Sequence, residues 1–103
     1  MSDDPVRVVV HYRNPASPER AVQTAYQAAR DMLRGTPGLV RHELLRSTAG
    51  DDVFALLMEW EDTAAYEAWE REMRRQGHPS PLRPYQDRSR PGGHYEVYTV
   101  TER

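Results

Sequence analysis

Apolar and polar side chains alternate along residues 6–12, which is the pattern of a β-strand with one buried face. One face of this segment carries three valines and a tyrosine, at Val6, Val8, Val10 and Tyr12. His11 falls on the opposite, more polar face. The alternation stops at Asn14, and beyond it the apolar spacing changes to three and four residues, which predicts a helix.

This helical spacing occurs twice along the chain. The first helix is predicted to begin after Ser17, a good N-cap residue, and to stop at Gly35. Its apolar stripe consists of Val22, Ala25, Tyr26, Ala29, Met32 and Leu33. The second helix is predicted to be capped by Asp62 and to end at Gly77. Its apolar stripe consists of Tyr66, Trp69 and Met73.

Three further strands complete the pattern. Residues 39–46 and 53–60 flank a hairpin turn at 49–52, and residues 94–101 alternate near the end of the chain. The 53–60 segment is almost continuously apolar, which is typical of a central strand. The order β-α-β-β-α-β predicts an α+β domain of the ferredoxin-like class. Its first strand should lie beside the third in an antiparallel sheet, with both helices on one face.

Length and composition limit the functions that this fold can serve. The 103 residues fit a single domain, 1–103, and only 38% of them are hydrophobic. We therefore expect a second copy to cover the open sheet face, giving a homodimeric α/β barrel. A net charge of −2 gives no positive electrostatic field that would attract nucleic acid, so we expect no nucleic-acid partner. No apolar run could span a membrane and the acidic start resembles no signal peptide, so we expect a cytoplasmic protein.

The segment 77–93 interrupts the regular pattern with four prolines, three glycines and three arginines. So long an irregular segment in a small domain is usually functional or mobile. We predict a lid over a binding pocket, in which Leu82 and Tyr85 point inward. Arg83 or Arg88 would then meet an anionic oxygen of a ligand.

Three consecutive segments carry a family resemblance. Pro37-Gly38-Leu39-Val40 leads into one strand, Met58-Glu59-Trp60-Glu61-Asp62 ends the next, and Ala64-Ala65-Tyr66-Glu67-Ala68-Trp69 follows. This run is similar to the antibiotic-biosynthesis-monooxygenase-like family. The resemblance implies a ferredoxin-like fold that pairs into a dimeric α/β barrel. It leaves the reaction open, because this fold serves oxygenases, polyketide cyclases, heme proteins and proteins with no known activity.

The cofactor-free anthrone oxygenases of this family imply substrate contacts at Trp60 and Tyr66. These enzymes place an asparagine where this chain has Leu56. Trp69 would either pack in the core or contact the ligand as well. The resemblance therefore implies a monooxygenase, without flavin or metal, that oxidises a polyketide-like phenol or anthrone with dioxygen in secondary metabolism. Trp60, Tyr66, Trp69, Arg83 and Tyr85 are its candidate substrate-binding residues.

Two alternatives remain. The heme-degrading branch of the family carries a tryptophan and a histidine at the spacing of Trp69 and His78, which would make His78 a ligand of heme iron. That branch has an asparagine near the position of Val10. A polyketide cyclase or a non-catalytic binding module using the same pocket is the other alternative.

Histidine is the side chain whose ordinary pKa suits proton transfer near neutral pH. His11 and His94 are the candidate bases, because the first and last strands should lie side by side. The chain has no cysteine or lysine, which excludes thiol nucleophiles and Schiff-base chemistry. No pair of histidines has the helical spacing of metal ligands, so we predict no metal site.

Overall fold

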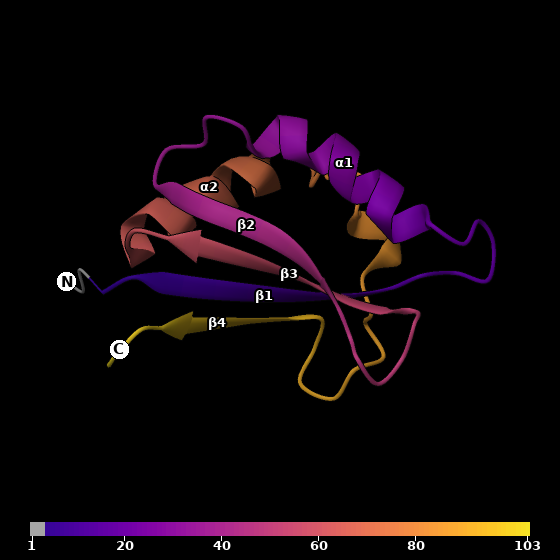
Figure 1. Cartoon of the computed structure of the whole chain (residues 1–103). Helices are drawn as coiled ribbons and strands as arrows, with labels where there is room; N and C mark the ends of the chain where they lie inside the picture. The colour runs from indigo at the N-terminus through magenta and orange to yellow at the C-terminus, as the bar shows by residue number, and fades with distance from the viewer. Residues whose placement is uncertain (1–3) are drawn as a thin grey trace.

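The computed structural model describes residues 4–103 and arranges them as a four-stranded antiparallel sheet with two helices on one face (Figure 1). The strands are β1 (Val6–Arg13), β2 (Leu39–Arg46), β3 (Val53–Trp60) and β4 (Tyr95–Thr99). The helices are α1 (Ala21–Leu33) and α2 (Thr63–Arg75), followed by a short 3-10 turn, η1 (Arg83–Tyr85). The arrangement confirms the predicted α+β ferredoxin-like fold.

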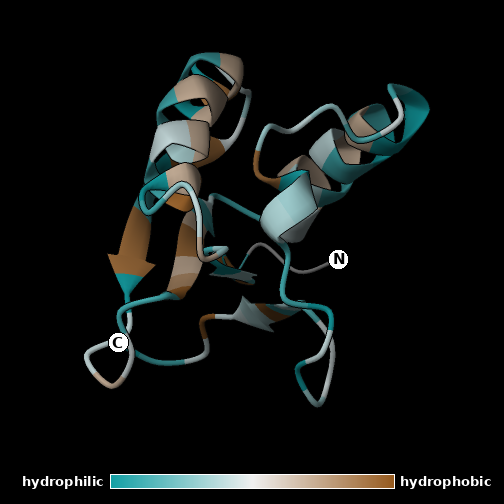
Figure 2. Cartoon of the chain, turned by 90° about the vertical axis from the view of Figure 1, so that its right-hand side faces the viewer, coloured by the Kyte–Doolittle hydropathy of each residue, from teal (hydrophilic) through white to brown (hydrophobic). Residues whose placement is uncertain are grey.

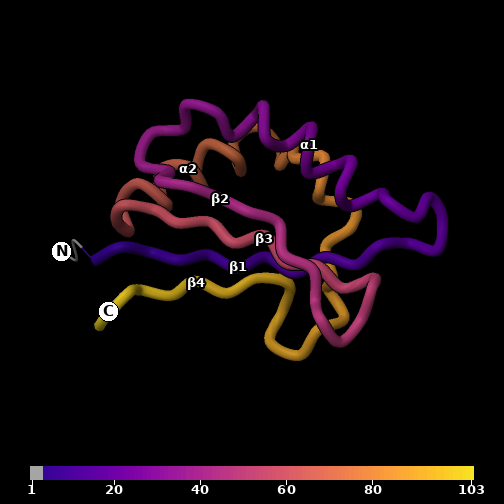
Figure 3. Tube along the Cα trace, in the orientation of Figure 1, coloured from indigo at the N-terminus to yellow at the C-terminus, as the bar shows by residue number. Residues whose placement is uncertain are grey.

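The sheet has the strand order β2-β3-β1-β4, so β1 lies beside β3 as the sequence predicts. Their antiparallel register runs from the pair Val6 and Trp60 to the pair Arg13 and Val53. The chain trace in Figure 3 shows β4 at the outer edge, beside β1. This register places Val6, Val8 and Tyr12 of β1 on the same, helix-covered face as the buried side chains of β3, which are Phe54, Leu56, Met58 and Trp60.

The core lies between this face and the two helices, which stand side by side above the sheet in Figure 2. Its most deeply buried large side chains are Trp60, Met58, Leu82, Val6, Val8 and Val22. Leu82 belongs to the irregular 77–93 segment, yet it is only 1% exposed. One part of that segment is therefore packed into the core.

The helix starts differ from each other in how well the sequence predicts them. Asp62 caps α2 as predicted, because its Oδ1 accepts a hydrogen bond from the Ala65 amide at 2.8 Å. Ser17 does not cap α1, which begins at Ala21. Instead, Oδ1 of Asn14 accepts the amide of Val22 at 2.8 Å. The prediction at Ser17 was wrong because a more distant side chain satisfies the first turn of this helix.

The opposite face of the sheet has no helix over it within residues 4–103. Its centre is apolar and half-buried, with Val9, Ala55 and Leu57. Arg7 forms an ion pair of 3.0 Å with Glu59 on this face, and Arg41 also pairs with Glu59. No helix in the described part of the chain is both long and apolar enough to cross a membrane.

Candidate functional site

A cavity of about 450 Å³ lies between the helix-covered face of the sheet, the two helices and the 77–93 segment. Its floor is apolar and comes from the two central strands, through Val8, Val10, Leu56 and Met58. Met32 and Leu33 of α1 contribute further apolar surface. Such a space suits a small, largely apolar ligand. Leu56, on this floor, offers the cavity no polar group.

Aromatic side chains of α2 line one side of the cavity. Tyr66 and Trp69 border it directly, whereas Trp60 is fully buried and does not reach it. The ring of Trp60 supports both, at centroid distances of 5.8 Å to Tyr66 and 5.3 Å to Trp69. The Tyr66 hydroxyl donates to Glu70 at 3.4 Å, and burial raises the pKa of Tyr66 far above its ordinary value. Tyr66 is therefore a neutral hydrogen-bonding group near neutral pH.

The two candidate bases lie on opposite faces of the sheet. His94 lines the cavity, whereas His11 is on the open face, where its Nε2 lies 2.5 Å from Glu96 Oε1. Their backbones are adjacent as expected, since the His11 amide donates to the His94 carbonyl at 2.7 Å. Burial, and then the nearby charge of Arg88, lowers the pKa of His94. His94 is thus unprotonated near neutral pH and can accept a proton from a molecule in the cavity.

The 77–93 segment forms the remaining wall of the cavity. Arg83 and Arg88 both border it, whereas Tyr85 packs against the core without lining it. The Asp87 amide donates to the His11 carbonyl at 2.9 Å, which fastens the segment to β1. The position of the segment fits a lid, and its opening and closing stay a prediction.

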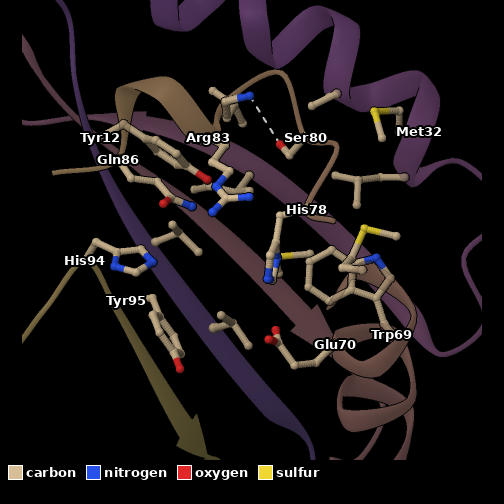
Figure 4. A pocket seen from close by; sticks show the side chains of 18 of the residues that line it. Tyr12, Met32, Trp69, Glu70, His78, Ser80, Arg83, Gln86, His94 and Tyr95 are labelled. Carbon is tan, nitrogen blue, oxygen red and sulfur yellow. Dashed lines mark hydrogen bonds between the residues drawn. The ribbon is translucent and has the colours of Figure 1, made fainter. Parts of the chain in front are cut away.

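His78 also borders the cavity, on the same side as Trp69 (Figure 4). It follows α2 with a backbone φ of 56°, in the left-handed region, and its amide donates to the Met73 carbonyl at 2.8 Å. No described side chain hydrogen-bonds to its imidazole. Within residues 4–103 there is no group of three or more histidine, cysteine, aspartate or glutamate side chains that could hold a metal ion.

Sequence reasoning missed several polar residues of the cavity. Tyr12 was identified only as an apolar strand position, and no sequence pattern identified Gln86 as a residue of the cavity. Glu70 could have been found, because it lies one helical turn after Tyr66 and so shares its face. All three border the cavity.

Comparison with known proteins places the chain in a family. A family model described as antibiotic biosynthesis monooxygenase matches residues 5–76. No curated protein matches the chain significantly.

Several solved structures share the fold. SnoaB, a cofactor-independent oxygenase from Streptomyces nogalater, is 21% identical, with a TM-score of 0.67 over 97% of this chain and 94% of that one. A heme-degrading protein from Mycobacterium tuberculosis is 18% identical, with a TM-score of 0.67 over 99% and 97%. A conserved protein from Methanosarcina mazei is 12% identical, with a TM-score of 0.70 over 98% and 95%. At such identities the likeness concerns the fold alone, and the family match shows that this chain belongs to the antibiotic biosynthesis monooxygenase family.

Proposed function

We propose that the protein is a cofactor-independent oxygenase that oxidises an electron-rich aromatic compound, a polyketide-like phenol or anthrone, with dioxygen. The observation that carries this proposal is the pairing of an apolar cavity with an imidazole of lowered pKa, that of His94, at its wall. The fold shared with a cofactor-independent oxygenase supports the proposal without fixing the substrate.

The reaction needs little chemistry from the protein. His94 removes an acidic proton from the bound anthrone or phenol, leaving a delocalised carbanion. The carbanion donates one electron to dioxygen, and the resulting radical pair combines to a peroxide. Loss of water then leaves a carbonyl group, so that one dioxygen converts a ring CH₂ into C=O and water. His94 is the general base of this scheme.

The side chains of the cavity would orient the aromatic substrate. Tyr66 and Trp69 offer ring surfaces on one wall, and the valines and Leu56 of the floor exclude water. Trp60 acts from beneath, by holding the two cavity-lining rings in place. Holding the substrate in a dry, fixed orientation lowers the barrier to proton removal.

Heme binding is the second candidate function, because His78 and Trp69 border the same cavity. His78 would be the residue that holds the heme iron, through an imidazole nitrogen, since its ring makes no hydrogen bond to a described side chain. Adding hemin distinguishes the two functions. A shift of the hemin Soret band that is lost in the variant His78→Ala, with no oxygen uptake on phenols, would favour heme binding.

Oxygen consumption tests the leading proposal. With 1,8-dihydroxyanthrone and no added cofactor, we expect oxygen uptake above the spontaneous rate and formation of the anthraquinone. His94→Gln should lower kcat by about 10²–10⁴-fold, the usual contribution of a general base. His11→Gln is the matched control and should change kcat little, because its ring lies on the other face of the sheet. Product without oxygen consumption would instead indicate a cyclase.

A further inference from the structure

Three hydrogen-bond donors that take no part in proton removal by His94 converge on one wall of the cavity. Tyr12, Arg83 and Gln86 all border the cavity. Figure 4 shows their polar ends on the same side of the space, away from Trp69. They come from distant parts of the sequence, since Tyr12 lies on β1 and the other two on the 77–93 segment.

The backbone on this wall is held firmly. Gln86 forms an antiparallel bridge with Tyr12, and the next amide, of Asp87, donates to the His11 carbonyl at 2.9 Å. The Gln86 amide itself donates to the Arg83 carbonyl at 3.2 Å, closing the turn η1. The three donors are therefore placed by strand pairing and by a closed turn.

Arg88 fixes which end of the Gln86 side chain faces the cavity. Nη2 of Arg88 lies 2.6 Å from Oε1 of Gln86. A guanidinium group can only donate hydrogen bonds, so the amide oxygen of Gln86 must be the atom that faces Arg88. The NH₂ group of Gln86 is then left free to donate, and no described residue accepts from it.

The other two donors also lack an anionic partner. Arg83 donates only to the Gly77 carbonyl, at 3.2 Å, and no carboxylate within residues 4–103 forms an ion pair with it. Burial raises the pKa of Tyr12 far above its ordinary value, so its hydroxyl keeps its proton. No described group accepts from that hydroxyl either. Donors that face one space without an acceptor between them form a binding site for an oxygen anion.

We propose that Tyr12, Gln86 and Arg83 form an oxyanion site that holds the ionised oxygen of the substrate, with Arg88 as the positioning residue of Gln86. This inference rests on the proposed function and narrows its substrate class to aromatics that carry a phenolate or enolate oxygen. The proposed base, His94, lies close to the residue after Gln86, because the backbones of His94 and Asp87 both hydrogen-bond to the backbone of His11. Removal of a proton by His94 would thus send the negative charge toward these donors.

Binding of a chromogenic phenol tests the site without any turnover. 4-Nitrophenol changes its absorption when it ionises, and its methyl ether, 4-nitroanisole, is a neutral ligand of similar shape. We expect the wild-type protein to lower the apparent pKa of bound 4-nitrophenol. Tyr12→Phe and Gln86→Leu should each weaken phenolate binding about tenfold, the scale of one hydrogen bond to a charged group, and leave 4-nitroanisole binding unchanged.

The positioning role of Arg88 needs its own comparison. Arg88→Met should weaken phenolate binding, and Arg88→Lys should largely restore it, because an ammonium group can also donate to the amide oxygen of Gln86. Arg71→Met is the matched control: it removes the same charge from an exposed position of α2 that does not border the cavity. It should leave the apparent pKa of the bound probe unchanged.

Two results would overturn the oxyanion site. One is a wild-type protein with no preference for 4-nitrophenolate over 4-nitroanisole. The other is an equal loss of affinity for 4-nitrophenolate and for 4-nitroanisole in Tyr12→Phe and Gln86→Leu, which would indicate a packing effect. Oxygen uptake in the presence of either result would leave the proposed oxygenase standing. A phenolate preference that depends on Gln86, without oxygen uptake on any phenol, would remove the oxygenase and keep the anion site.

Discussion

At the scale of single residues, His11 and His94 show how strand geometry separates two similar side chains. The sequence places His11 on the more polar face of its strand, which is where the structure has it, paired with Glu96. The position of His94 could not be derived in the same way, because it precedes β4 and the alternation of a strand does not apply to it. Its place at the cavity follows from the packing of the 77–93 segment.

The lowered pKa of His94 gives the reaction a defined pH dependence. A base works only when unprotonated, so kcat/KM should fall as the pH drops through the pKa of His94. Burial and the charge of Arg88 place that pKa below the ordinary value of 6.5. Arg88→Gln removes the second of these causes and should move the acid limb of the profile to higher pH. An acid limb that does not move in this variant would contradict the role of His94.

The two tryptophans should respond differently to truncation. Trp60 is fully buried, so Trp60→Ala should destabilise the fold by about 3–5 kcal/mol, as expected for a large core side chain. Trp69 is half-buried against the cavity, so Trp69→Ala should destabilise the fold less than Trp60→Ala does and weaken the binding of aromatic ligands more. Urea unfolding together with ligand titration measures both effects. Equal losses of stability in the two variants would show that Trp69 is chiefly a core residue.

At the scale of elements, the sequence predicts a helix cap well when the capping side chain and the amide that it binds are close along the chain. Asp62 caps α2 by accepting a hydrogen bond from the amide of Ala65, three residues later, which is within the range of an N-cap pattern. Asn14 reaches Val22 across a loop, a contact that no short pattern encodes. The final strand is likewise shorter than predicted, Tyr95–Thr99 in place of residues 94–101, because an edge strand extends only as far as its pairing with β1.

Gly38, just before β2, tests a close approach between elements. Its φ of 81° lies in the left-handed region, and an added Cβ would come within 2.3 Å of the Ala65 Cβ on α2. Gly38→Ala should therefore destabilise the protein by about 2–4 kcal/mol, through backbone strain and overpacking together. Gly35→Ala is the control, since its φ is 75° and an added Cβ would contact nothing within 4 Å. In thermal unfolding, the melting temperature of Gly38→Ala should be well below that of Gly35→Ala. The reverse order would contradict the proposed clash.

At the scale of the whole molecule, the order of elements was enough to predict the fold. The family resemblance came from the segments 37–40, 58–62 and 64–69, and the walls of the cavity followed from neither. Topology follows from β-α-β-β-α-β because handedness and strand pairing leave few arrangements. The cavity wall depends on Leu82 entering the core and on the bridge between Gln86 and Tyr12. Both are contacts of an irregular segment, whose conformation no periodic pattern specifies. That is why Tyr12 and Gln86 could not be identified as polar groups of the cavity.

The open face of the sheet leads to a prediction about assembly. Val9, Ala55 and Leu57 form an apolar centre there that no helix within residues 4–103 covers. Covering this centre with the same face of a second copy would remove it from water, and the two-fold pairing would be self-complementary. Light scattering at micromolar concentration should therefore report roughly twice the 11.9 kDa mass of one chain.

Leu57 is the position at which this assembly can be broken without harming the fold. It pairs with Val9 on one side and Glu43 on the other, so it lies near the middle of the open face. Leu57→Arg should give monomers with an unchanged circular dichroism spectrum, because two opposed arginines would meet at the centre of the interface. Val40→Arg introduces the same charge at a residue that is 64% exposed and should remain dimeric. A wild-type protein that is monomeric at every concentration would remove the barrel model, since the sheet face would then stay open to water.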